Sequence, residues 1–313
     1  MATTTAPAPA PARKPKVSTR ASDRSRSENF LGWRLAGPAV AVMLLVTAWP
    51  MGRAIYLSLF NYRLTDPEGR EFTWVQNYGV VLSDPLWWRA VAVGAGIMVV
   101  TVVVELVIGF AFALVMHRII FARGVVRTSI LVPYGIITVV SAYAWQFAFK
   151  NDSGFVAGWF GLGADFDPFG GFWGSMFVIC MAEIWKTTPF VSLLLLAGLA
   201  LVPEVLQEAA KVDGATAWQR LWRVTIPSMK AAIMVAVLFR ALDAFRVFDS
   251  IFIMTAGANG TSPPSGLVYN AMIQRVELGL GSAMSVLLFL FVLIIAFVLM
   301  RAFRVDLSQA RGQ

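Results

Sequence analysis

The chain has 313 residues, of which 58% are hydrophobic and only 14% are charged, against about 25% charged residues in typical soluble domains. This composition excludes an ordinary soluble protein and indicates a membrane protein. The formal net charge is +8, but the basic residues gather at the ends of hydrophobic runs, which argues against nucleic-acid binding. The single cysteine, Cys180, and single histidine, His117, exclude an intrachain disulfide and a Cys/His metal set.

The N-terminal segment, residues 1–33, is rich in Ala, Pro and Thr and then in Arg and Ser, with no helical period. It predicts a disordered basic tail. The apolar run that follows has no obvious cleavage site, so we interpret it as a membrane helix rather than as part of a signal peptide.

Hydrophobic runs long enough to cross a bilayer, which needs about 20 apolar residues, occur six times in the sequence. An all-α, polytopic membrane domain is therefore predicted over residues 34–305, followed by a short tail at 306–313. Prolines inside three of the runs are compatible with packed membrane spans. The predicted spans are about 36–60, 90–116, 124–149, 172–201, 230–255 and 282–303.

Basic residues predict the orientation of these spans. Lys and Arg are concentrated in the N-terminal tail, in the loops after the second and fourth spans, and at the C-terminus, whereas the opposite loops carry a more balanced set of charges. Both termini and the loop at 203–230 are therefore expected in the cytoplasm, on the inner face of a plasma membrane.

The 203–230 loop is polar enough to leave the bilayer, yet its apolar residues recur at helical spacing. Pro203 suits the start of a short helix, and Asp213-Gly214 suits its end, because glycine tolerates a positive φ. Thr216 is a candidate N-cap for a second short helix, which Pro227 would end. Two amphipathic helices on a membrane protein's loop predict docking of a soluble partner.

The same loop carries a family resemblance. Glu208-Ala209-Ala210, Gly214 and Ile226-Pro227 are similar to the EAA loop of binding-protein-dependent ABC importer permeases, with Ile226 where the family usually has Leu. The resemblance implies the type I importer permease fold and a cytoplasmic coupling helix that sits in a groove of a separate ATPase. The candidate coupling residues are Glu208, Ala209, Ala210, Asp213, Gly214, Arg220 and Pro227, of which Arg220 is chosen as a polar contact that would fix the register of the docked loop.

Two further segments, 186–190 and 238–246, resemble the sugar-importing branch of that family, of the maltose and trehalose type, and in particular the trehalose permeases of mycobacteria. The resemblance implies a bacterial inner-membrane protein that forms half of a pathway for a disaccharide, with trehalose favoured. It also implies a heterodimer with a second homologous permease, two ATPase subunits and an external substrate-binding protein or lipoprotein. ATP and Mg would be bound by the ATPase, and no cofactor is expected in this chain.

Charged residues inside the fifth predicted span, at three-residue steps, leave two interpretations open. In the first, Arg240–Asp243 and Arg246–Asp249 neutralise each other, because an exposed charge at the bilayer centre costs about 2.5–3.5 kcal/mol. In the second, some of them point into a cavity and bind sugar hydroxyl groups, with Phe239, Phe245 or Phe248 supplying a stacking surface. The candidate pathway residues are Arg240, Asp243, Phe245, Arg246 and Asp249. In the fourth span, Glu183 and Lys186 are predicted to pair with each other.

The sequence contains no G-x-x-x-x-G-K-[ST] phosphate loop, so the chain is not expected to hydrolyse ATP or to be an enzyme, and would have to borrow its energy from a partner. Two alternatives from other classes stay open. One is an ion-coupled carrier that acts alone, with Glu105 or Asp243 as its ion site. The other is a membrane-embedded enzyme acting on lipid-linked sugars, for which the sequence offers no cluster of catalytic residues.

Overall fold

The structure is a computed structural model that describes residues 20–119, 122–151, 154–163 and 166–303. It divides into two units, up to Arg53 and from Ala54 onward, which we describe separately. The predictions for residues 1–19 and 306–313 fall outside the described residues.

The first unit contains most of helix α1 (Arg20–Ser58). The disordered tail predicted up to residue 33 is therefore partly wrong, since the helix begins at Arg20. A long apolar helix extends readily into flanking polar residues, because adding one residue to an existing helix gains a hydrogen bond without a new nucleation cost. Side chains from Trp33 to Arg53 are exposed or half-buried.

The second unit begins with a small hairpin that the all-helical prediction missed. Strands β1 (Phe60–Arg63) and β2 (Asp66–Phe72) pair antiparallel, and Arg63 forms an ion pair of 2.7 Å with Glu277. Helix α2 (Gln76–Ser83) follows the hairpin. The hairpin lies where the first predicted span, about 36–60, ends and before the second, about 90–116.

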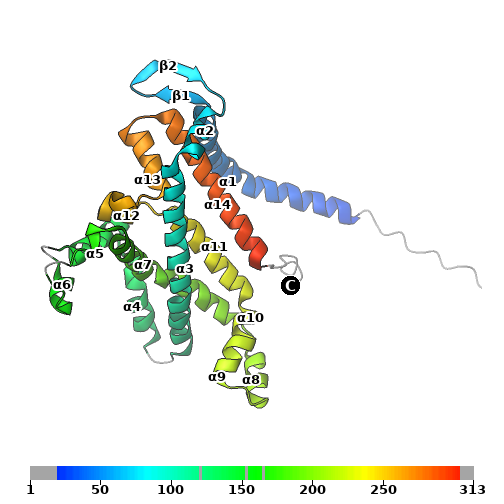
Figure 1. The fold of residues 1–313 in the computed structure, drawn as a ribbon. Coiled ribbons are helices and arrows are strands. Elements are labelled where there is room, and N and C mark those ends of the chain that lie inside the picture. Colours follow the sequence, from blue (N-terminus) through cyan, green and yellow to red (C-terminus); the bar gives the residue numbers. More distant parts are fainter. Residues whose placement is uncertain (1–19, 120–121, 152–153, 164–165, 304–313) are drawn as a thin grey trace, which may run out of the picture. The chain divides into compact units, whose positions relative to one another are not determined.

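Long helices build the membrane domain, with shorter helices between them (Figure 1). The helices of its first half are α3 (Pro85–Arg118), α4 (Arg123–Gly135), α5 (Thr138–Phe149), α6 (Phe155–Phe160), η1 (Pro168–Gly170) and α7 (Phe172–Ala200). Those of its second half are α8 (Glu204–Val212), α9 (Ala217–Arg220), η2 (Leu221–Thr225), α10 (Ile226–Ser228), α11 (Lys230–Phe245), α12 (Asp249–Thr255), η3 (Ala258–Gly260), α13 (Pro264–Tyr269), η4 (Asn270–Gln274) and α14 (Leu278–Phe303).

Four single helices among the described residues are long and apolar enough to cross a membrane, and the number reaches six if each of two bent helix pairs counts as one span. The four are α1 from Trp33, α3, α7 and α14. One bent pair is α4 with α5, where the helix turns by 86° just after Pro133. In the other, residues 217–228 meet α11 at 70°. The prediction of six spans agrees with this count when the bent pairs are included.

The continuous fifth span predicted at 230–255 is wrong. Helix α11 ends at Phe245 after 16 residues, or about 24 Å, and α12 begins only at Asp249. The carbonyl groups freed by the break find side-chain donors, since Arg246 Nε donates to Leu242 O and Ser265 Oγ donates to Val247 O. Irregular backbone at membrane depth is tolerated where it is satisfied in this way or lines a polar cavity.

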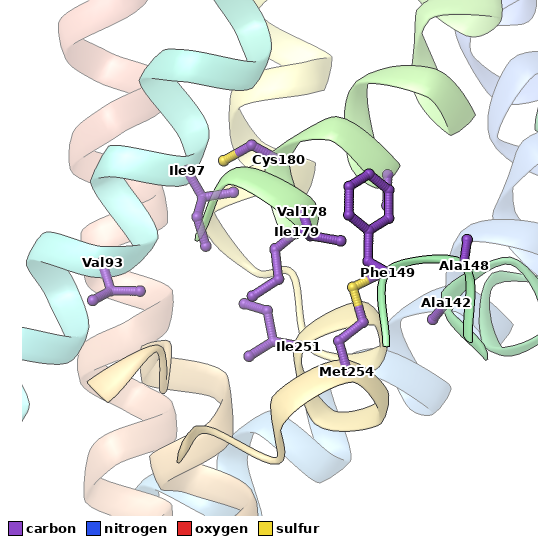
Figure 2. Packing of buried hydrophobic residues seen from close by; sticks show 11 residues of the cluster. Val93, Ile97, Ala142, Ala148, Phe149, Val178, Ile179, Cys180, Ile251 and Met254 are labelled. Atoms are coloured by element: carbon purple, nitrogen blue, oxygen red, sulfur yellow. The ribbon is translucent and has the colours of Figure 1, made fainter. Parts of the chain in front are cut away.

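Buried apolar side chains hold the broken helix in place. One cluster joins Ile251 and Met254 of α12 to side chains of α3, α5 and α7, among them Ile97, Phe149 and Ile179 (Figure 2). Gln146 of α5 donates hydrogen bonds to the carbonyl groups of residues 253 and 254, at 3.0 Å each. The short helix α12 is therefore fixed by neighbours distant in sequence rather than by α11.

Candidate functional site

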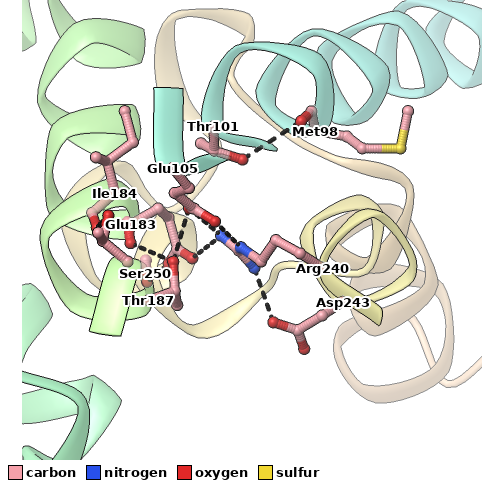
Figure 3. A network of polar contacts seen from close by, with 10 residues as sticks. Met98, Thr101, Glu105, Glu183, Ile184, Thr187, Arg240, Asp243 and Ser250 are labelled. Carbon is pink, nitrogen blue, oxygen red and sulfur yellow. Dashed lines mark hydrogen bonds and ion pairs between the residues drawn. The ribbon is translucent and has the colours of Figure 1, made fainter. Parts of the chain in front are cut away.

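A cluster of charged side chains lies in the interior of the membrane domain, with Arg240 of α11 at its centre (Figure 3). Arg240 is 2% exposed and Glu105 of α3 is 0% exposed. Arg240 Nε donates to Glu105 Oε2 at 2.6 Å, and Nη2 donates to Oε1 of the same carboxylate at 3.0 Å. This two-bond fork is the strongest geometry available to an arginine–carboxylate pair.

Two further carboxylates complete the surroundings of Arg240. Glu183 of α7, 5% exposed, accepts from Nη2 at 3.2 Å, and Asp243 accepts from Nη1 at 2.8 Å. These bonds and the fork use four of the five guanidinium N–H donors. Ser250 of α12 donates its hydroxyl proton to Glu183. Thr187 of α7 lies 2.7 Å from Glu105 Oε1. The cluster therefore joins α3, α7, α11 and α12.

These buried ion pairs add little to the net stability of the domain, but they fix the positions of the helices that carry them. Removing ions from water costs several kcal/mol for each ion, and good pairing offsets that cost without a large surplus. What the pairing does supply is a fixed relation between α11 and α12, because Arg240 before the break and Ser250 after it both bind Glu183. The carboxylate of α7 bridges the interrupted helix.

A polar cavity of about 410 Å³ lies beside this cluster. Its walls come from α4, α5, α7, α11, α12 and the break at 246–248, and they combine both signs of charge with hydroxyl groups and two aromatic side chains. The lining residues are Tyr134, Thr138, Glu183, Lys186, Thr187, Asp243, Arg246, Val247, Phe248, Asp249 and Ser250. Its size falls in the usual range of small-molecule sites, about 300–1,000 Å³.

The structure brings only some of the candidate pathway residues to this cavity. Asp243, Arg246 and Asp249 line it, and Arg240 stands behind Asp243 in the wall. Phe245 is 1% exposed and packs toward Phe291 of α14, so it does not line the cavity.

Two aromatic side chains line the cavity, Tyr134 and Phe248, and Phe248 stacks on Phe252 at a centroid distance of 5.2 Å. The break in the helix explains why Phe248 lines the cavity and Phe245 does not, because residues beyond Arg246 no longer follow the periodicity of α11.

Two predicted ion pairs do not form. Among the described residues no ion pair joins Arg246 to Asp249, because the break places them on different elements. Nor does one join Glu183 to Lys186, since Glu183 binds Arg240 and Lys186 Nζ donates to the carbonyl of Ile136 at 3.0 Å. The pair Arg240–Asp243 does form, as predicted.

Several cavity residues could not be recognised in the sequence. Tyr134, Thr138 and Ser250 are ordinary hydroxyl side chains in or near apolar runs, and no local pattern separates them from others. Lys186 gave a signal as an intramembrane charge, but its sequence neighbour Glu183 suggested the wrong partner.

The loop predicted to couple to an ATPase forms a distinct two-helix element, residues 203–228, which we call the coupling segment. Helix α8 ends in a Schellman motif, in which Gly214 has φ +76° and its N–H donates to Lys211 O while Ala215 N–H donates to Ala210 O. Thr216 and Gln219 form a capping box at the start of α9, which confirms the predicted N-cap.

The coupling segment presents apolar side chains outward. Large apolar residues are usually buried, so an exposed set on two adjoining short helices marks an interaction surface. Trp218 and Trp222 lie with their rings 5.7 Å apart. The exposed large apolar side chains are Val205, Leu206, Val212, Trp218 and Trp222.

The motif residues of the coupling segment are placed as follows. Glu208, Ala209 and Asp213 are exposed, whereas Ala210 and Arg220 are half-buried, and Nε of Arg220 is buried with no hydrogen-bond partner in the described residues. Pro227 does not end the second helix, which is a correction. The helix continues through it to Ser228 because a π turn at η2 precedes the proline, and the 70° bend follows at Met229.

Metal ligands do not gather anywhere in the part of the chain that the structure describes, where no group of three or more His, Cys, Asp or Glu side chains could hold an ion. The Glu105–Glu183 pair is instead occupied by the guanidinium of Arg240.

Comparison with known proteins identifies the family. The family described as "binding-protein-dependent transport system inner membrane component" matches residues 105–308, which include the charge cluster, the cavity and the coupling segment. The chain belongs to this family. It is thus a membrane-spanning transport component rather than an enzyme, as the sequence predicted.

Individual relatives are similar over most of their length. The trehalose transport system permease protein SugA of Mycobacterium tuberculosis is 48% identical over 277 residues, which cover 88% of this chain and 90% of that protein. The trehalose/maltose transport system permease protein MalF of Thermococcus litoralis is 34% identical, covering 85% of this chain and 91% of its own length. The predicted resemblance to sugar-type importer permeases is confirmed.

Solved structures show the same fold. A bacterial ABC transporter involved in the import of the acidic polysaccharide alginate aligns with a TM-score of 0.75 at 20% identity, covering 90% of this chain and 97% of that chain. A bacterial alginate ABC transporter in complex with an alginate pentasaccharide-bound periplasmic protein gives a TM-score of 0.74. The predicted fold class, an importer permease of the ABC type, is confirmed.

Proposed function

We propose that this chain is a permease subunit of an ATP-driven sugar importer and that it forms half of the pathway for a disaccharide. The observation that carries this proposal is the 48% identity with a trehalose permease, taken together with a polar cavity among membrane-spanning helices. Trehalose is the sugar that the relatives favour, because two of them carry it in their names.

The chemistry of the cavity supports a neutral, hydroxyl-rich ligand. Asp243 and Asp249 offer carboxylate oxygens that accept hydrogen bonds, while Lys186 and Arg246 offer donors. The signs are nearly balanced along the wall, so a ligand without charge meets no excess field. Phe248 supplies an apolar face of the kind on which a sugar ring packs.

The coupling segment supports an ATPase partner. It combines the EAA-type residues Glu208, Ala209 and Gly214 with an exposed apolar surface that includes two tryptophans. We place it in the cytoplasm, together with both termini, from the distribution of Lys and Arg. In this arrangement the second permease, two ATPase subunits with their ATP and Mg, and an external binding protein complete the transporter.

Reconstitution tests the proposal against the carrier alternative. The chain is incorporated into proteoliposomes with its second permease, the ATPase and the binding protein, and uptake of radiolabelled trehalose is measured with ATP inside. We expect uptake that requires ATP, the ATPase and the binding protein. Uptake that continues without the ATPase and follows an ion gradient would overturn the proposal.

Asp243→Asn tests the cavity. Its carboxylate side chain is 69% exposed toward the cavity, and the change keeps the shape while removing the charge and one acceptor. We expect sugar uptake to fall roughly tenfold, which corresponds to about 1.4 kcal/mol, in a complex that still assembles because Arg240 keeps two other carboxylates.

The matched control is Asp84→Asn, which changes the N-cap of α3 to another good cap residue outside the cavity. Unchanged uptake by an assembled Asp243→Asn complex would show that the Arg240 cluster is purely structural.

A further inference from the structure

The two helical parts of the coupling segment are joined by one side-chain hydrogen bond. Gln207 of α8 donates from Nε2 to Oγ1 of Thr225, the last residue of η2, at 2.9 Å. Helix α8 has no buried residue, and only Gln207 and Ala210 are half-buried. Because so little apolar surface is buried beneath α8, this bond is a large share of what holds the helix on the rest of the segment.

Thr225 is set up to receive the bond. It is 8% exposed, and its own hydroxyl lies 3.3 Å from the carbonyl oxygen of Arg220, to which it donates. The hydroxyl of Thr225 gives its proton to this carbonyl, and its lone pairs remain free for Gln207.

Beyond Thr225 the chain is anchored directly into the membrane domain. The N–H of Met229 donates to Thr225 O at 3.0 Å. Met229 is 1% exposed and packs in one cluster with Leu195 and Leu199 of α7 and Ala236 of α11. The bend at Met229 leads into α11, the helix that carries Arg240 and lines the polar cavity through Asp243.

We propose that Gln207 and Thr225 are positioning residues for energy coupling. Their bond holds α8 on η2, so a displacement of α8 by the docked ATPase is passed through Thr225 and Met229 to α11 instead of being lost in the exposed turns at either end of α8. This inference rests on the proposed function, since it needs an ATPase that moves α8. It assigns to two residues outside the EAA-type pattern the task of making the segment move as one body.

The test uses the full complex in proteoliposomes, with Gln207→Met and Thr225→Val, which keep the approximate size of each side chain and remove the bond. Trehalose uptake and ATP hydrolysis are measured in the same vesicles. We expect the ATPase to copurify as before, and the number of sugars carried per ATP to fall about threefold to tenfold, the range that loss of one hydrogen bond produces. Thr225→Ser, which retains the hydroxyl, is expected to preserve the ratio.

A matched control is Ser228→Ala. It deletes a hydroxyl one turn away whose one partner among the described residues is Val224 O of the same helical stretch, and it should leave the ratio unchanged. The double variant Gln207→Met/Thr225→Val should be no worse than either single variant, because both remove the same bond. Gln207 is half-buried on a short helix, so its replacement keeps the test valid if Thr225→Val lowers the yield of folded protein.

The outcomes separate this inference from the proposed function. If the wild-type complex shows no ATP-dependent uptake, the proposed function fails. If the wild type is coupled and the two single variants carry as many sugars per ATP as the wild type, or if their effects add in the double variant, the positioning role is overturned while the proposed function stands.

Discussion

Arg240→Met is expected to destabilise the membrane domain by about 3–5 kcal/mol, the cost of removing one partner from a buried ion pair. The substitution leaves Glu105 and Glu183 buried at 0% and 5% exposure without their cation. Thr187 still donates a hydrogen bond to Glu105, and Ser250 still donates one to Glu183, but neither hydroxyl group supplies a positive charge. The measurement is the thermal unfolding midpoint of the purified permease in detergent, with the yield of monodisperse protein.

The matched control is Arg246→Met, the same change six residues later in the chain. Arg246 is exposed, and its Nε donates to Leu242 O. We expect this variant to lose about 0.5–1.5 kcal/mol, the usual worth of the one hydrogen bond to Leu242 O, which is clearly less than the loss for Arg240→Met. Equal unfolding midpoints for the two methionine variants would contradict the role that we give to the buried cluster.

A second variant separates charge from packing. In Arg240→Met/Glu105→Met the most deeply buried carboxylate is removed together with its cation. Glu183 is then the one buried carboxylate of the cluster that remains, with Ser250 as its hydrogen-bond donor. If unpaired charge causes the loss, the double variant should be more stable than Arg240→Met alone. If lost packing causes it, the double variant should be at least as unstable.

Gly214→Pro is expected to reduce ATP-driven uptake more than tenfold while the membrane domain stays folded. Gly214 has φ +76°, whereas the proline ring fixes φ near −65°. Proline also removes the N–H that donates to Lys211 O at 3.0 Å in the Schellman motif. The turn between α8 and α9 would have to be rebuilt, and the two exposed apolar surfaces that we assign to ATPase docking would separate.

Graded variants at the same position make this test quantitative. Gly214→Ala can occupy the left-handed region at a cost of about 1–2 kcal/mol, and Gly214→Asn at less, because asparagine tolerates this conformation. No Cβ clash is expected, since nothing lies within 4 Å of a Cβ built on Gly214. Copurification of the ATPase should therefore decrease in the order Gly, Asn, Ala, Pro. Full copurification and uptake for Gly214→Pro would contradict the coupling role.

The coupling segment was predictable because its signals are local. A left-handed residue after a helix requires glycine or a short polar side chain, and a capping box requires Thr216 and Gln219 three residues apart. The predicted end of the second helix at Pro227 was wrong because it depended on a feature that the sequence does not mark. Pro227 lacks an N–H, but the wider π turn before it absorbs that loss, and this widening has no signature in the sequence.

The polar cavity beside Arg240 was only partly predictable. Charge inside an apolar run is costly, so Arg240 and Asp243 had to be satisfied by some partner, and their pairing with each other could be read from the three-residue spacing. The partners of Arg240 on other helices could not be predicted from the sequence. Glu105 lies 135 residues before Arg240, and nothing in the sequence between them specifies that α3 and α11 meet at that level.

What the sequence by itself determined is that the chain lies in a membrane, the approximate number of its spans, and the two-helix form of the coupling segment with its glycine turn and N-cap. These depend on composition, run length and turn chemistry, which act over a few residues. The tertiary structure decided which charges pair, where the fifth span breaks, and that Phe248 rather than Phe245 faces the cavity. The physical reason is that a buried charge selects its partner from every helix packed around it, and the break between α11 and α12 is held by Glu183 of α7, a residue of another helix.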